Sequence, residues 1–191
     1  MNIFDLIKSR RTIRKFQSKP ISDELLLKYV DSARVAPSGA NMQPLKYVIV
    51  KSPDMVNKVF ENVKWAGYLA PQYNPKDNER PTAFIVVLAD TNIRASGYDT
   101  DVGAAVENII LTALEDKVGA CWMAAINREE IGKLIDIGED YIISCVVALG
   151  YSMESPKEVK VQDGNIKYYL DENGTLCVPK RSLDEVLIKQ M

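Results

Sequence analysis

Histidine is absent from the 191 residues of this chain. Its absence removes the commonest general base and metal ligand, and with it any serine or cysteine nucleophile activated by histidine. The chain also lacks the glycine-rich signature of dinucleotide sites, the phosphate loop that ends in Gly-Lys-Ser/Thr, the Cys-x-x-Cys pair and any cluster of carboxylates at metal-binding spacing. We therefore expect no bound metal, and any chemistry must be carried by other means.

Cysteines are few, and Cys121, Cys145 and Cys177 are odd in number and widely spaced. This pattern does not resemble a disulfide framework and predicts reduced thiols. No apolar run approaches the roughly 20 residues of a membrane-spanning helix, and the N-terminus lacks the charge-then-apolar order of a signal peptide. We expect a soluble, cytoplasmic protein that does not bind membranes.

Neither sign of charge dominates, because the net charge is −2. This balance argues against a surface-wide attraction to nucleic acid or anionic lipid. A length of 191 residues with 47% hydrophobic and 26% charged residues is typical of one globular domain. We expect a single domain over residues 1–191, with a hairpin and helix extension at about 157–191.

Capping residues and apolar spacing predict that helices and strands alternate. Helices are expected after Asn2 and after Ser22, over 53–63 and 100–117, and after Asn127. Strands are expected over 47–51, 83–89, 119–125 and 141–149. The pairs Asp163-Gly164 and Asn173-Gly174 then predict hairpin turns before a final helix around Leu183, Val186 and Leu187.

The expected helix over 100–117 is apolar almost all round. A chain of this size can hardly cover every side of such a helix, and Gly103 and Ala104 would permit close approach. We therefore expect it to be partly buried against a second copy of the chain. The polar residues Asp101, Glu107 and Asn108 argue against burial in lipid.

Three segments are unusual: the basic run Ser9–Phe16, the loop Pro37–Pro44, and Pro179-Lys180-Arg181. Arginine offers a planar fork of donors that suits both a phosphate and an electron-rich ring. However, cations at the end of a helix also simply complement its dipole, and loop amides commonly satisfy the local backbone. Taken one at a time, each segment leaves both interpretations open.

Taken together and in order, these segments resemble the nitroreductase family. The family's Arg-Arg-Ser-x-Arg-x-Phe run is matched by Arg10-Arg11-Thr12-Ile13-Arg14-Lys15-Phe16. Its Ala-Pro-Ser-x-x-Asn-x-Gln-Pro segment stands here as Ala36-Pro37-Ser38-Gly39-Ala40-Asn41-Met42-Gln43-Pro44. Its Gly-x-x-Trp strand is Gly119-Ala120-Cys121-Trp122, followed by Ala148-Leu149-Gly150-Tyr151 and the terminal basic pair. The match spans nearly the whole chain and specifies the family without specifying a substrate.

The resemblance implies a nitroreductase-like α+β fold, in which helices flank a central, mostly antiparallel sheet and two chains form an intertwined homodimer. It also implies FMN at the dimer interface and NADH or NADPH as electron donor. The acceptor would be a small electrophile such as a nitroaromatic or a quinone, reduced after the nicotinamide has left in a ping-pong cycle. Flavin itself carries the hydride, so no side chain need be catalytic.

The resemblance also implies which residues hold the flavin. The phosphate and pyrimidine edge fall to Arg10, Arg11, Thr12 and Arg14, with Lys180 and Arg181 closing on the phosphate. The partner subunit supplies Pro37, Ser38 and Gly39, supported by Asn41 and Gln43. Backbone N–H groups of Met123, Ala124 and Ala125 lie near the reactive flavin nitrogen.

The sequence departs from the family's pattern at two places. Alanine replaces the usual glycine at Ala124 and Ala125, which could narrow the approach to the flavin ring. Leu45 stands where an aromatic residue commonly follows Gln-Pro. In related proteins the segment around residues 62–81 often lids the flavin pocket. The candidates there for stacking on a substrate ring are Trp65, Gly67, Tyr68 and Tyr73, although core packing explains aromatic residues equally well.

Other functions remain open at this point. A flavin-binding module for storage or redox sensing would show little turnover. A specialised relative, such as a reductive dehalogenase or a flavin-degrading enzyme, would usually carry extra lid segments that this chain lacks. Binding of nucleic acid by the two basic clusters would weaken steeply with salt, and the acidic overall balance disfavours it.

Overall fold

The computed structural model describes residues 2–191, and its centre is a four-stranded antiparallel sheet in the order β1-β2-β4-β3. The strands are β1 (Leu45–Val50), β2 (Ala83–Asp90), β3 (Val118–Met123) and β4 (Tyr141–Tyr151). Strand β3 ends two residues earlier than expected, because the ladder with β4 stops at the pair Met123 and Val146. The expected antiparallel sheet is otherwise confirmed.

Three of the helices begin at a residue whose side chain caps them. Asn2, Ser22 and Asn127 each accept a hydrogen bond from the backbone N–H three residues later. The helices are α1 (Ile3–Ser9), α2 (Asp23–Arg34), α3 (Pro53–Glu61), α4 (Asp99–Glu115) and α5 (Arg128–Ile135), with single turns η1 (Gly39–Asn41) and η2 (Asp77–Glu79). None of the helices formed by residues 2–191 could span a membrane.

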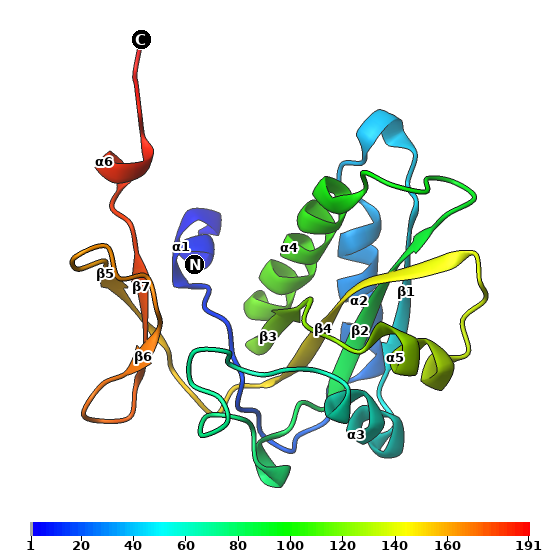
Figure 1. Cartoon of the computed structure of the whole chain (residues 1–191), viewed down its shortest axis with the longest axis horizontal. Coiled ribbons are helices and arrows are strands. Elements are labelled where there is room, and N and C mark those ends of the chain that lie inside the picture. Colours follow the sequence, from blue (N-terminus) through cyan, green and yellow to red (C-terminus); the bar gives the residue numbers. More distant parts are fainter. Residues whose placement is uncertain (1) are drawn as a thin grey trace.

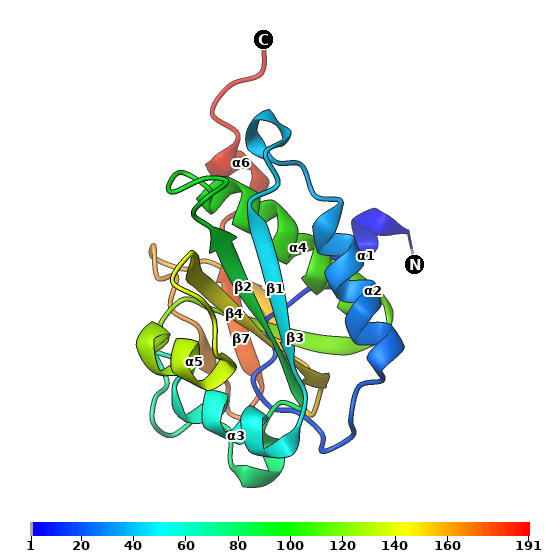
Figure 2. The same ribbon diagram turned by 90° about the vertical axis from the view of Figure 1, so that its right-hand side faces the viewer.

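The sheet lies between two layers of helices (Figure 2). On one face Ile85 and Val87 pack in a cluster with Val106 of α4 and with residues of α2. On the other face Phe84 and Val86 pack with residues of α3 and α5. Because both faces are covered, every residue of β2 from 83 to 89 is buried, as its unbroken apolar run predicts. The fold is therefore α+β, as expected.

Helix α4 receives more cover from its own chain than we expected. The sheet, α2 and α1 all contact it. Its buried residues are Asp101, Val102, Ala105, Val106, Ile109, Ile110 and Ala113. Elements of the same chain thus cover part of α4, but ten of its 17 residues stay at least partly exposed, so burial of the rest against a second copy stays a prediction. Gly103, Ala104 and Glu107 remain partly exposed.

The C-terminal part forms a small sheet of its own, ordered β5-β7-β6. Its strands are β5 (Lys157–Lys160), β6 (Tyr169–Leu170) and β7 (Leu176–Lys180). Both predicted turns form, since Gly164 and Gly174 adopt φ angles of +73° and +72°. Only the second joins paired strands, β6 and β7, because β5 pairs in parallel with β7 and the first turn closes only the bridge between Gln162 and Asn165. Helix α6 (Leu183–Val186) has only four residues and leaves Leu187 outside. It is shorter than expected because none of its residues is buried.

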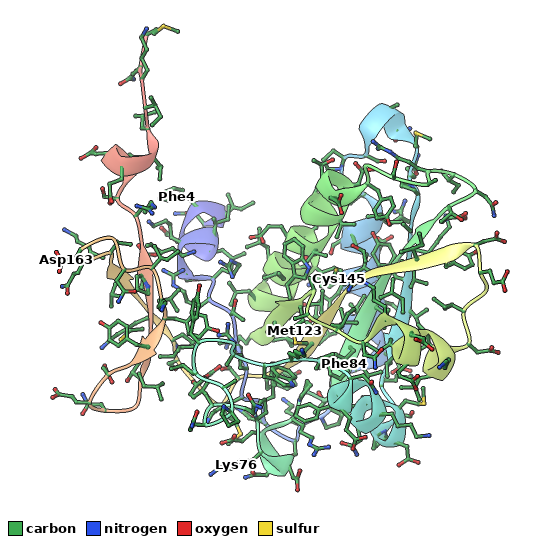
Figure 3. The ribbon with its side chains drawn as sticks, viewed as in Figure 1. Phe4, Lys76, Phe84, Met123, Cys145 and Asp163 are labelled. Atoms are coloured by element: carbon green, nitrogen blue, oxygen red, sulfur yellow. The ribbon has the colours of Figure 1, made fainter. Side chains whose placement is uncertain are left out.

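This C-terminal sheet lies beside α1, on the side of α4 away from the central sheet (Figure 1). Figure 3 shows the same division, with Phe4 and Asp163 on the outlying part and Phe84, Met123 and Cys145 in the main body. The chain then leaves this part as an extended tail (Figure 1). Both ends of the chain lie on the left-hand side of the molecule in Figure 1, but they are well apart in both views.

Candidate functional site

The basic N-terminal run, residues 10–16, is anchored on the edge of the central sheet by its two apolar residues. Ile13 and Phe16 are buried, and a Cβ atom at Gly119 or Gly150 would come within 2.7 Å or 2.8 Å of them. Both glycines are therefore needed for this close approach. The Ile13 N–H also donates to the Ala120 carbonyl at 2.9 Å. Anchoring by Ile13 and Phe16 leaves the polar residues between them to line a surface.

The N-terminal run and the C-terminal basic pair converge, although they are distant in sequence. Arg10, Arg11, Lys180 and Arg181 line one pocket of about 330 Å³, which we call the cationic pocket. Lys8, Glu107 and Glu158 also line it, so five cations and two carboxylates leave a net charge of +3. Such an excess of positive charge suits a phosphate group.

Two cations of this pocket have unused binding capacity. The side chain of Arg11 is 10% exposed and contacts Glu158, yet its buried Nε atom has no hydrogen-bond partner. The Lys180 ammonium makes no ion pair with any residue from 2 to 191. Arg10 pairs with Glu107 of α4 at 3.6 Å and Arg181 with Glu185 at 3.7 Å. An anionic group would therefore satisfy donors that the chain leaves unsatisfied.

A second pocket of about 220 Å³ shares Arg10 and Arg11 with the cationic pocket. Its lining includes the apolar side chains of Ile13, Ile110 and Leu114. The two pockets together provide an anion-binding part beside a partly apolar part. Thr12, Arg14 and Lys15 of the same run are partly exposed nearby along the chain. This arrangement fits a molecule that carries a phosphate at one end and a less polar body at the other.

The Pro37–Pro44 loop is organised by one carboxylate that we did not single out for this role. Asp101 of α4 is 4% exposed and accepts hydrogen bonds from the Ser38 hydroxyl at 2.6 Å and the Gly39 N–H at 3.2 Å. The Ser38 hydroxyl in turn accepts from the Gln43 N–H at 2.9 Å. The bond from Ser38, with Arg94 at 3.8 Å, holds the pKa of Asp101 below its usual value.

The same loop borders a groove of about 400 Å³ between α2 and β1, which Pro37, Ser38 and Gln43 help to line. Asn41 has a φ angle of +55° and accepts, through its carbonyl, a bond from the Gln43 side chain at 3.1 Å. Both amide side chains are exposed. Gln43 thus contacts the backbone of the loop, while the support that the resemblance implies for the two side chains stays a prediction.

Within one chain the loop and the N-terminal run lie on different sides of α4. Ser38 and Gly39 bind Asp101, whereas Arg10 pairs with Glu107. Six residues of α-helix separate the two carboxylates by about 9 Å along the axis and about 120° around it. In Figure 1 the loop lies beyond the upper end of α4, and α1 lies on the opposite side from α2. One chain thus does not bring these two predicted parts of the site together.

The segment Met123–Ala125 follows directly on β3. Met123 is buried, while Ala124 and Ala125 are exposed. The Ala125 carbonyl accepts from the Lys64 N–H at 3.0 Å. The backbone N–H groups of Ala124 and Ala125 donate to no acceptor among residues 2–191, so both are available to an added group.

The candidate lid residues have different surroundings. Trp65 is 5% exposed and packs on Phe60, with ring centroids 5.4 Å apart. Tyr73 is 6% exposed. Neither ring has a free face for stacking in this structure, so these two side chains belong to the core. Gly67 is exposed, and Tyr68 is 54% exposed and packs against Tyr168 of the C-terminal part with the two rings tilted by 49°.

The cysteines and acidic residues of the described chain offer no reactive thiolate at Cys121 or Cys145 and no metal cluster. Burial raises the pKa values of Cys121 and Cys145 to about 11, so these thiols stay protonated at neutral pH. All three cysteines are free and buried. Across residues 2–191 no group of acidic or cysteine side chains could hold a metal ion. The binding features of the site therefore come from cations and backbone N–H groups.

Sequence reasoning missed two acidic residues that organise this site. Asp101 had a detectable signal, because a carboxylate within an otherwise apolar helix needs a buried partner, but we used it only as an argument against lipid. Glu154, which accepts hydrogen bonds from the backbone of Arg14 and Lys15, carried no such signal. Its importance follows only from the position of the N-terminal run on β4.

Comparisons with known proteins point to one family. The model of the nitroreductase family matches residues 7–151. A relative from Archaeoglobus fulgidus named "Putative NADH dehydrogenase/NAD(P)H nitroreductase" is 34% identical over 162 residues, which cover 81% of this chain and 86% of that protein.

Solved structures show the same fold. A nitroreductase family protein from Clostridium novyi is 28% identical, with a TM-score of 0.69, over 92% of this chain and 96% of that one. A protein from Desulfovibrio desulfuricans, described as a "putative nitroreductase in complex with FMN", has a TM-score of 0.71 at 20% identity, over 100% and 98% of the two chains. The family model spans both the anchored N-terminal run and the Asp101 loop, and this chain belongs to the nitroreductase family.

Proposed function

We propose that this protein is an FMN-dependent oxidoreductase that transfers hydride from NADH or NADPH to small electrophiles such as nitroaromatics or quinones. The observation that carries the proposal is the cationic pocket, where Arg10 and Arg11 meet Lys180 and Arg181 beside a partly apolar pocket. The relatives named as nitroreductases and the neighbour in complex with FMN support the choice of cofactor. The buried, unpartnered Nε atom of Arg11 is consistent with it.

In this proposal the chain binds and orients the cofactor. Arg10, Lys180 and Arg181 bind the phosphate, and Arg11 and Thr12 contribute further donors. Arg14 places a cation near the pyrimidine edge, where negative charge accumulates on reduction. Bound FMN supplies the hydride chemistry. The free N–H groups of Ala124 and Ala125, next to Met123, offer donors toward the flavin ring.

The cycle is ping-pong, because oxidised nicotinamide leaves before the acceptor enters the same site. Tyr68 is the exposed one of the three candidate aromatic residues in the 62–81 segment and can contact either ring, while the exposed Gly67 beside it leaves room for approach. In this proposal the buried rings of Trp65 and Tyr73 support the segment around residues 62–81 from within the core. No side chain needs to act as a nucleophile, in keeping with the protonated thiols and the absence of histidine.

The proposed working unit is a homodimer in which each chain completes the site of the other. Ser38 and Gly39 cannot reach the N-terminal run of their own chain around α4, so a second copy supplies Pro37, Ser38 and Gly39. Gly103 and Ala104 offer a partly exposed, small-residue surface for close approach of that copy. Sedimentation equilibrium tests this proposal, and a monomer at micromolar concentration with FMN bound would contradict it.

The visible spectrum of the purified protein under anaerobic conditions tests cofactor and reaction together. We expect a bound-flavin spectrum that bleaches when NADH or NADPH is added and returns when a quinone or a nitroaromatic follows. Bound flavin that fails to bleach would favour a storage or redox-sensing module instead. Protein that cannot hold FMN would contradict both functions.

A further inference from the structure

Glu154, which follows β4, connects two segments of the proposed site. Its carboxylate accepts hydrogen bonds from the backbone N–H groups of Arg14 and of Lys15, the latter at 3.3 Å. It also accepts a hydrogen bond from the hydroxyl of Tyr73. One side chain therefore joins the N-terminal run to the 64–73 segment.

The groups around Glu154 are themselves held in place. The Glu154 N–H donates to the Ser152 hydroxyl at 3.1 Å, and the neighbouring Met153 N–H donates to the Lys15 carbonyl at 2.9 Å. The Lys15 ammonium lies 4.8 Å from the centre of the Tyr73 ring. Burial, and then the bond to Glu154, raise the pKa of Tyr73, so its hydroxyl keeps its proton and donates at neutral pH.

The guanidinium end of the Arg14 side chain is held by a tyrosine ring. Its guanidinium lies 4.7 Å from the centre of the Tyr168 ring. The Tyr168 ring packs against the Tyr68 ring, with centroids 4.9 Å apart and the rings tilted by 49°, and the Tyr68 N–H donates to the Tyr168 hydroxyl at 3.3 Å. The backbone of Arg14 thus contacts Glu154 while its guanidinium contacts Tyr168. We call Glu154, Tyr73, Tyr168 and Tyr68 the Arg14 clamp.

We propose that Glu154 is a positioning residue that directs Arg14 toward the flavin, and that Tyr168 fixes the orientation of the guanidinium. This inference rests on the proposed function, in which Arg14 lies near the pyrimidine edge. A carboxylate offers two oxygens with several acceptor sites, so it can serve three donors at once. A cation that moves away from the flavin loses electrostatic interaction, and it loses most with the anionic reduced form.

The charge of Glu154 and its hydrogen bonds predict opposite effects of a Glu154 substitution on the affinity for FMN. Removing a negative charge from a cationic site should tighten the binding of FMN if only the net charge matters. Releasing the backbone of Arg14 and Lys15 should weaken it if position matters. Substitution of Glu154 therefore separates the two explanations.

The first experiment titrates the apoproteins of Glu154→Ala, Glu154→Gln and wild type with FMN, well below their unfolding temperatures. We expect the dissociation constant to rise at least tenfold for Glu154→Ala and less for Glu154→Gln, whose amide oxygen can still accept. The matched control is Glu129→Gln, which removes an exposed carboxylate paired with Lys133 on α5 and should leave the constant unchanged. Equal or tighter binding by Glu154→Ala would overturn the inference.

The second experiment measures the midpoint potential of FMN bound to Tyr168→Leu, which leaves every charge in place. Loss of the contact between the guanidinium and the ring should reduce the preference for reduced over oxidised flavin by about two- to fivefold, and so lower the potential. An unchanged potential would contradict the role of Tyr168. Wild-type protein that binds no FMN would overturn the proposed function and this inference with it, whereas variants that match wild type would overturn the inference alone.

Discussion

The N-terminal run and the Pro37–Pro44 loop both present polar groups to the proposed site, but different forces hold them. Ile13 and Phe16 bury the run against the central sheet, and its backbone forms hydrogen bonds with Ala120 and Met153. Between residues 37 and 43 the loop has no buried side chain. It depends instead on hydrogen bonds to Asp101 and contains three non-glycine residues with positive φ angles, at Ala40, Asn41 and Gln43.

This difference shows that one site can combine a segment placed by packing with a segment placed by charge. Packing of apolar side chains against a sheet hardly depends on pH or salt. A buried carboxylate organises a loop only while it remains ionised. We therefore expect the two segments to respond differently to the same perturbation, and the following variants test that expectation.

Phe16→Ala should have the largest effect. It removes a fully buried ring that fills the space beside Gly150, and such substitutions typically cost about 3–5 kcal/mol of unfolding free energy. Urea unfolding monitored by circular dichroism measures the change. The matched control is Phe4→Ala on α1, whose ring is 67% exposed and should contribute little. A loss below about 1 kcal/mol would show that packing does not hold the run, because this lies under the range for buried rings.

Asp101→Asn should have the next largest effect. The amide cannot accept from both Ser38 and Gly39 and leaves Arg94 unpaired, which costs about 1–3 kcal/mol. Urea unfolding again measures it. Hydrogen exchange should also increase at the Gly39 and Gln43 amides. An unchanged exchange rate at these amides would mean that the loop holds its shape without the carboxylate.

The contribution of Asp101 should depend on pH. Its pKa is lowered in the folded protein, chiefly by the Ser38 hydroxyl. Such a group contributes stability that is complete above its unfolded pKa, about 3.9, and is lost as the pH falls toward the folded value. The difference between wild type and Asp101→Asn should therefore be largest near neutral pH and shrink below about pH 4. A constant difference from pH 3 to 7 would contradict this assignment.

Lys180→Met tests whether the phosphate of FMN binds in the cationic pocket, beside the N-terminal run, and not at the Pro37–Pro44 loop. Loss of the unpaired cation in the cationic pocket should raise the dissociation constant of FMN about tenfold, or about 1.4 kcal/mol. Binding of riboflavin, which has no phosphate, should not change. Lys133→Met on α5 provides a control for the loss of one charge. An equal loss of affinity for FMN and for riboflavin would mean that the phosphate binds elsewhere.

Ala40→Gly should have the smallest effect. Ala40 has a φ angle of +51°, which glycine adopts without steric cost. The greater freedom of glycine in the unfolded chain offsets part of the gain, so we expect a stabilisation below about 1 kcal/mol. Ala40→Val should destabilise, because a branched residue is strained at positive φ. If both variants destabilised equally, strain at this position would not matter.

Several local features were readable from the residues themselves. The caps at Asn2, Ser22 and Asn127 and the glycine turns were predicted correctly, because short-range hydrogen bonds and backbone sterics depend on residues close in the chain. The buried run of β2 was also predicted from its unbroken apolar pattern. The extent of α6 was not, since a short helix without a buried face gains little from propensity.

The sequence by itself determined the order of the elements and the family. Only the tertiary structure decided that Arg10 and Lys180 share a pocket, that Asp101 holds the loop, that Glu154 joins Arg14 to Tyr73, and that Trp65 belongs to the core. Caps and turns depend on neighbours within a few residues. Contacts between distant segments depend on how the helices pack on the sheet, and no local pattern encodes that packing.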